Sequence, residues 1–132
     1  MLGSVTVTRE MLIADKACDP AIDAFDFSFP CGSATLQEIV DHYLCEPDWL
    51  GWLAAHGSFI ASDIAMLLIQ WSGDPGKYYG EAAIWADWVT AETGPEIISK
   101  SSEPRHIAKR AILLADWMTS DIEAELVAKH GL

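Results

Sequence analysis

The stretch FIASDIAMLLIQW, from Phe59 to Trp71, is the part of the chain that says most about the fold. Its apolar residues recur at intervals of three and four, as they do along one face of an α-helix. The stretch is too short to span a bilayer, which needs about 20 apolar residues. Gly73 and Pro75 follow it as helix stop signals. We therefore predict a central core helix in an all-α domain. The residues expected on its buried face are Ile60, Ile64, Leu67, Leu68 and Trp71.

An acid–proline pair occurs four times along the chain at nearly even intervals, and a hydroxyl residue follows the proline of each pair at one constant distance. Proline suits the first position of a helix, and Ser and Thr are preferred helix N-caps. The pairs are Asp19-Pro20, Glu46-Pro47, Asp74-Pro75 and Glu103-Pro104, and the hydroxyl residues are Thr35, Ser62, Thr90 and Thr119. Each unit is therefore expected to form two helices of about ten residues.

This spacing predicts about seven or eight short helices in consecutive antiparallel hairpins, within one domain that spans residues 1–132. Four degenerate helical repeats of about 28 residues would produce the pattern, with units starting near residues 19, 46, 74 and 103. A compact bundle whose helices share common caps would produce it too. Both interpretations give an all-α fold.

Helix-start signals mark three further positions. Thr8 is expected to cap a short helix, and the weakly alternating residues before it predict a short strand or an extended arm. Thr35 with Glu38, and Ser120 with Glu123, have the spacing of capping boxes.

The formal net charge is −12, from 20 acidic and 8 basic residues. Direct binding of nucleic acid needs clustered Lys and Arg, so this composition disfavours it. An acidic surface favours a protein partner with a basic surface, such as the nucleic-acid groove of another protein. The simpler alternative is that the charge keeps a small apolar protein soluble. The charge and the sequence indicate neither membrane binding nor a particular oligomeric state.

Three cysteines and one histidine make up the candidate metal or thiol site. The short spacing from His42 to Cys45 suits Zn²⁺, but the gaps to Cys31 and Cys18 are long for a usual site. Cys18 and Cys45 each precede an acid–proline helix start, so burial at a hairpin turn is expected to explain these two without a metal. The first residues lack a basic start and a long apolar run, so we expect no signal peptide, reduced thiols and a cytoplasmic protein. No cofactor is expected.

Acidic residues and tryptophans supply the candidate binding surface. Asp19, Asp23 and Asp26 follow helical spacing and predict an acidic stripe on one helix face. All six tryptophans are expected in helices, mostly in the core, and one member of each of the pairs Trp49/Trp52 and Trp85/Trp88 is a candidate interface anchor. The residues predicted to bind a partner are Asp19, Asp23, Asp26, Glu46, Asp48, Trp49 and Trp52.

A local pattern resembles a short helical module of many small phage and bacterial accessory proteins. Its parts, within roughly the first 55 residues, are Val7–Ile13, Ala17-Cys18-Asp19 through to Phe25, Phe29-Pro30, Thr35-Leu36 and Asp48–Leu53. The resemblance implies a phage or mobile-element setting and no defined activity. Small acidic helical proteins from that setting include anti-CRISPR proteins and nucleic-acid mimics.

These observations predict a non-enzymatic protein that presents an acidic face to a protein with a basic surface. Its concrete form is a phage- or mobile-element-encoded inhibitor of a host complex that targets nucleic acid. Two alternatives stay open. One is a metal or thiol protein that uses Cys18, Cys31, His42 and Cys45, and the other is an immunity or assembly factor.

Overall fold

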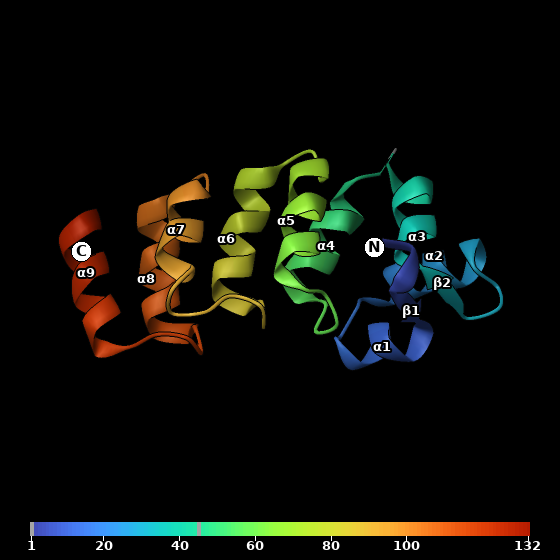
Figure 1. Cartoon of the computed structure of the whole chain (residues 1–132), viewed down its shortest axis with the longest axis horizontal. Coiled ribbons are helices and arrows are strands. Elements are labelled where there is room, and N and C mark those ends of the chain that lie inside the picture. The colour runs from blue at the N-terminus through green and yellow to red at the C-terminus, as the bar shows by residue number, and fades with distance from the viewer. Residues whose placement is uncertain (1, 45) are drawn as a thin grey trace. The chain divides into compact units, whose positions relative to one another are not determined.

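The computed structural model describes residues 2–44 and 46–132, which contain nine α-helices and one small β-sheet (Figure 1). The all-α fold class is therefore confirmed, with more helices than the seven or eight expected. The chain divides into two compact units, Met1–Glu46 and Pro47–Leu132, and each is described by itself. The interpretation as a single domain stays a prediction. In the described ranges, no helix has both the length and the apolar character needed to cross a membrane.

The first unit combines three helices with a two-stranded antiparallel sheet. Val7 lies opposite Ala34 in that sheet, and both are buried, which ties the start of the chain to the third helix. The expected short strand before Thr8 is present. In chain order, the elements are a 3-10 helix (Leu2–Ser4), β1 (Thr6–Thr8), α1 (Arg9–Ala14), α2 (Asp19–Ser28), β2 (Ser33–Thr35) and α3 (Leu36–Tyr43).

Two predicted helix caps in the first unit are confirmed. The side chain of Thr8 accepts a hydrogen bond from the backbone N–H of Met11, so it caps α1. Thr35 and Glu38 form the expected capping box at α3, in which each side chain accepts from the backbone N–H of the other residue. These bonds satisfy N–H groups that a helix start leaves without partners.

The second unit consists of six helices that follow one another in a row (Figure 1). Contacts join α4 to α6 and α6 to α8, and each of these three helices also packs against the helix that follows it. The second unit is thus built from three successive helix pairs. In chain order, the elements are α4 (Asp48–His56), α5 (Ser62–Trp71), α6 (Pro75–Trp85), α7 (Gly94–Lys100), α8 (Pro104–Leu114) and α9 (Ser120–His130).

The central helix predicted from the quoted stretch is α5, which begins at Ser62 and ends at Trp71. Gly73, with a φ of 83°, follows it in the left-handed conformation expected for a helix stop. Ile64 and Leu68 are buried as predicted, but Leu67 and Trp71 are exposed. That part of the prediction is wrong because α5 packs on α4 and α6, and its apolar surface is wider than these contacts cover.

In the second unit, contacts between successive helix pairs recur at a fixed interval along the sequence. This interval equals the sequence separation of Trp88 and Trp117. Trp88 Nε1 donates to the carbonyl of Ala54 at 2.7 Å, and Trp117 Nε1 donates to the carbonyl of Ala83 at the same distance. Both tryptophans lie in turns, so the prediction that all six lie in helices is wrong for these two. Each helix ends before its tryptophan because the indole reaches back to the preceding pair.

Three other features recur with the same spacing. A Cβ on Gly51 would meet the ring of Tyr78, and a Cβ on Gly80 would meet the Ile107 side chain. The hydroxyl of Ser72 donates to the carbonyl of Ile69 at the end of α5, and the hydroxyl of Ser101 donates to that of Ile98 at the end of α7. The C-caps of α6 and α8, Ala86 and Ala115, both have an extended backbone. The contacts thus repeat within the second unit, while the interpretation as four degenerate repeats stays a prediction.

Of the four hydroxyl residues expected as N-caps from the acid–proline spacing, Thr35 and Thr119 are caps. Ser62 and Thr90 are not, because Ala61 is the N-cap of α5 and Thr93 is the N-cap of α7.

The capping box expected at the start of α9 is wrong by one position. Thr119, not Ser120, is the N-cap of α9, and its hydroxyl accepts from the backbone N–H of Ile122. Ser120 is the first residue of the helix, so the expected box with Glu123 is wrong. Thr119 has an extended backbone with a ψ of 163°, the geometry that lets a side chain turn back onto the first helical turn.

Candidate protein-binding surfaces

The acidic stripe predicted on α2 is present in the first unit. Asp19 and Asp23 are exposed along this helix, and Asp26 is half-buried. Arg9 Nε donates to Asp26 Oδ2 at 3.0 Å, so one of the three carboxylates already has a cationic partner. Exposed pairs of this kind add at most about 1 kcal/mol, so the bond contributes little to stability.

The other predicted residues lie at the start of α4 and just before it. Glu46 is exposed and belongs to the first unit. Asp48, Trp49 and Trp52 belong to α4 of the second unit, and both tryptophans are half-buried. The ring of Trp52 stacks on that of His56 with centroids 5.4 Å apart. The seven predicted residues therefore form two groups. Asp19, Asp23, Asp26 and Glu46 belong to the first unit, and Asp48, Trp49 and Trp52 belong to the second.

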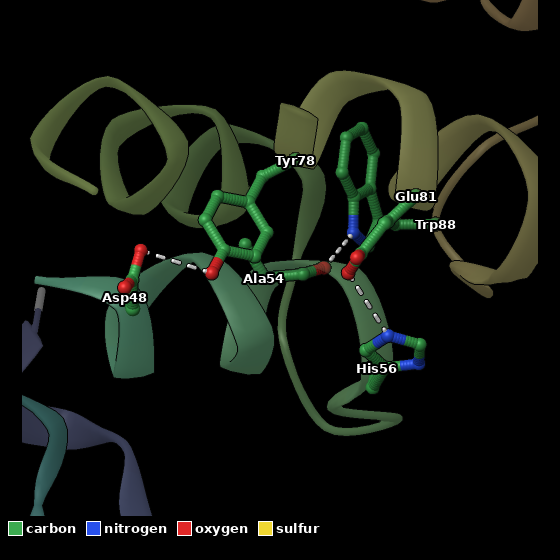
Figure 2. A network of polar contacts seen from close by, with 6 residues as sticks. All are labelled: Asp48, Ala54, His56, Tyr78, Glu81 and Trp88. Atoms are coloured by element: carbon green, nitrogen blue, oxygen red, sulfur yellow. Dashed lines mark hydrogen bonds and ion pairs between the residues drawn. The ribbon is translucent and has the colours of Figure 1, made fainter. Parts of the chain in front are cut away.

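A chain of polar contacts fastens α6 and the turn after it to α4. Figure 2 shows three bonds of this kind: Tyr78 Oη to Asp48 Oδ1 at 3.2 Å, Trp88 Nε1 to Ala54 O at 2.7 Å, and His56 Nε2 to Glu81 Oε2 at 3.3 Å. Each bond joins a group on α4 to a group on α6 or its following turn, so the bonds fix the position of one helix pair on the next.

The ionisable groups of this network are tuned by their neighbours. Burial raises the pKa of Tyr78, and the carboxylate of Asp48 raises it further, which keeps the phenol a neutral donor. The hydrogen bond from His56 lowers the pKa of Glu81 and outweighs the opposite effect of burial. Both shifts favour the protonation states that the bonds need. The three bonds therefore stabilise the second unit, and we assign them no catalytic role.

A groove of about 310 Å³ lies between α5 and α7 in the second unit. Ile97 is buried, Met66 and Trp88 are half-buried, and these three side chains give the groove its apolar character. The carboxylates of Asp63 and Glu96 are also part of its lining. The remaining lining residues are Ser62, Thr90, Thr93 and Lys100.

Sequence reasoning did not predict this groove. Its residues come from two helices and a turn that lie far apart in the sequence, and only the packing of successive pairs brings them together. One signal was available. Ala86-Asp87-Trp88-Val89-Thr90 recurs as Ala115-Asp116-Trp117-Met118-Thr119, and the first of these motifs supplies two lining residues.

The candidate metal and thiol residues are only partly described. Cys18 is exposed as the extended N-cap of α2, so its expected burial at a hairpin turn is wrong. Cys31 is exposed too, and its Sγ donates to the backbone carbonyl of Ser33. His42 Nε2 and Ser28 Oγ share a hydrogen bond of 2.8 Å. Within residues 2–44 and 46–132, no three His, Cys, Asp or Glu residues come close enough to hold a metal ion. Cys45 lies outside the described residues, so this finding does not extend to a site that includes it.

Comparison of the chain with protein-family models, with curated proteins and with solved structures finds no match. The resemblance to phage and bacterial accessory proteins therefore stays a prediction. The surfaces described above are the main basis for a proposal of function.

Proposed function

We propose that the protein is a non-enzymatic binding module that holds a short basic and apolar segment of a partner protein in the α5–α7 groove. The observation that supports this most is the composition of the groove, in which the apolar side chains of Met66, Trp88 and Ile97 lie with the carboxylates of Asp63 and Glu96. Binding grooves for peptides use apolar contacts for affinity and a few polar groups for specificity.

The charge of the groove and of the whole chain favours a partner segment that is basic. The groove contains two carboxylates and one ammonium group, from Lys100, which forms a long ion pair of 3.9 Å with Glu96. The whole chain carries a net charge of −12, which attracts cations over distances longer than a direct contact. A segment with Lys or Arg beside apolar residues complements both the local and the overall charge.

A nucleic-acid-binding protein is the partner class we propose, because such proteins expose clustered Lys and Arg. Inhibition of a nucleic-acid-targeting complex is the concrete form of this proposal. The net charge supports it, and the link to host defence rests on the sequence resemblance alone.

The test measures binding of fluorescent peptides of about 12 residues that alternate Lys with Leu, and of matched peptides in which Glu replaces Lys. We expect the basic peptide to bind and the acidic peptide not to bind. The double variant Asp63→Lys/Glu96→Lys should weaken binding of the basic peptide by at least about tenfold, since it reverses both carboxylates of the groove. Met66→Ser should weaken it as well, because it removes apolar contact area from the groove without adding a charge.

A matched control is the double variant Asp19→Lys/Asp23→Lys, which makes the same change in net charge on α2 of the first unit. We expect it to reduce affinity by much less than the groove variant. The opposite ranking would show that the acidic stripe of α2 is the binding surface and that the groove is not. Circular dichroism of each variant establishes that it is folded.

A further inference from the structure

The last helix pair, α8 and α9, exposes apolar residues at positions that the preceding pair buries. Leu113 is 82% exposed, whereas Ile84, its equivalent in the α6–α7 pair, is 4% exposed. Val127 is 39% exposed, whereas its equivalent Ile98 is completely buried. Leu113 and Val127 thus occupy positions that are buried in the α6–α7 pair, which has a further pair beside it. The α8–α9 pair lies at the end of the row of helices in the second unit (Figure 1).

Two glycines of the α6–α7 pair lie where the next pair comes closest. A Cβ on Gly80 would come within 2.9 Å of Ile107 Cδ1, and a Cβ on Gly94 would press into the Trp117 ring. Absence of a side chain at these two places lets α8 and its following turn pack closely on α6 and α7.

The corresponding positions of the α8–α9 pair are Lys109 and Glu123, both exposed. Backbone bonds support this register, since Gly94 N donates to Thr90 O at 2.7 Å and Glu123 N donates to Thr119 O at 2.9 Å. A further pair cannot pack here as α8–α9 packs on α6–α7, because two long charged side chains now stand where the glycines stood. The face is nevertheless partly apolar, and its two charges are of opposite sign.

We propose that this face, made by Lys109, Leu113, Glu123 and Val127, binds the same face of a second copy of the chain about a two-fold axis. In such a self-complementary contact, a residue of one copy meets a second residue of the other copy. By symmetry, the second residue of the first copy also meets the first residue of the other. Lys109 of each copy meets Glu123 of the other. Leu113 and Val127 each lie one helical turn from this pair, on opposite sides of it along the helices. The dimer covers the exposed apolar residues and pairs both charges.

The wider charge pattern of the two helices favours the same arrangement. Helix α8 carries three basic residues and no acidic ones, and α9 carries three acidic residues and one lysine. A two-fold axis that runs along the two helices sets α8 against α9 of the other copy, so opposite charges face each other across the contact. Two helices of 11 residues per copy form a small interface, typical of complexes with dissociation constants in about the micromolar range.

Sedimentation equilibrium between about 1 and 200 µM tests the proposal. We expect a monomer–dimer equilibrium that shifts toward monomer when salt is raised, because the two charge pairs are screened. Lys109→Glu and Glu123→Lys should each raise the dissociation constant by at least about tenfold, since either change makes both pairs repulsive. The double variant Lys109→Glu/Glu123→Lys should recover dimerisation, because it restores both pairs with the signs exchanged.

The apolar part of the contact has its own variant. Leu113→Asp should abolish the dimer, whereas Phe27→Asp, at an 89% exposed position of the first unit, should leave it unchanged. Three outcomes would overturn the proposal: a monomer at every concentration, a dimer that withstands the single charge changes, or open-ended assemblies that indicate head-to-tail contacts.

Discussion

At the scale of single residues, the indole N–H groups of Trp88 and Trp117 make the most specific contacts between helix pairs. Each donates to a backbone carbonyl of the preceding pair at 2.7 Å, and each ring is half-buried. Such a carbonyl loses its partner when the indole is removed, and an unsatisfied buried polar group costs about 1–3 kcal/mol.

Trp88→Phe and Trp117→Phe should therefore each lower the free energy of unfolding by about 1–3 kcal/mol, measured by urea unfolding at pH 7. The two losses should be similar because the two contacts are equivalent. Trp85→Phe is the control, since Trp85 is 48% exposed, and its effect should stay within about 0.5 kcal/mol. A Trp85 variant as unstable as the other two would contradict this interpretation.

The sequence predicts that Trp88 and Trp117 lie in the folded part of the chain. It does not predict that they lie in turns. Ala-Asp-Trp-Val continues an apolar helical pattern without Gly or Pro, so nothing local ends α6 at Trp85. The helix ends because Ala86 becomes extended, with a ψ of 135°, and this lets Trp88 reach Ala54. A long-range contact decides this boundary, and one sequence does not reveal such a contact.

At the scale of elements, helix starts are the features that sequence predicts best. An acid–proline pair begins α2, α6 and α8, because proline is already set in a helical φ angle and needs no N–H partner there. Helix faces are predicted less well. Leu67 and Trp71 follow the helical spacing of buried residues but are exposed, since spacing does not tell how many neighbours a helix has.

Thr119→Ala should lower the free energy of unfolding by about 1 kcal/mol, because the hydroxyl that caps α9 is lost. Ser120→Ala should change it by less than about 0.5 kcal/mol, because Ser120 is exposed inside the first turn. Urea unfolding of the two neighbouring variants measures the difference. Equal losses, or a larger loss for Ser120→Ala, would place the cap at Ser120, as its capping-box spacing with Glu123 predicts.

The candidate site shows a similar division. The carboxylates of α2 could be predicted as a stripe because one helix carries them all. The α5–α7 groove could not, because Asp63, Trp88 and Glu96 come from three different segments. Helical period describes one element at a time, and a groove is a property of two or more.

At the scale of the whole molecule, acidic residues outnumber basic ones by 20 to 8, so stability should depend on which carboxylates have favourable partners. Glu81 is one of these, because the bond from His56 holds its pKa below the ordinary value of 4.5. A lowered carboxyl pKa stabilises the folded state above the unfolded value, and this contribution is lost as pH falls through the folded value.

Glu81→Gln should therefore be less stable than the wild type at pH 7, and the difference should shrink as the pH falls below 4.5. Urea unfolding at a series of pH values from 7 to 3 gives the difference directly. Glu92→Gln removes a carboxylate from an exposed position and serves as the control. A difference for Glu81→Gln that stays constant over the whole series would contradict the role of the His56 bond.

The constant spacing of the contacts between helix pairs has an evolutionary consequence. If residues 75–103 were deleted, Trp117 would stand opposite the carbonyl of Ala54, and Ile107 would stand opposite Gly51. Both contacts repeat ones that the chain already makes. Duplication of the same segment would add a helix pair whose contacts with its neighbours are of the kind that the chain already makes. A gene for such a chain can therefore grow or shrink by unequal recombination, one helix pair at a time, without inventing a new interface.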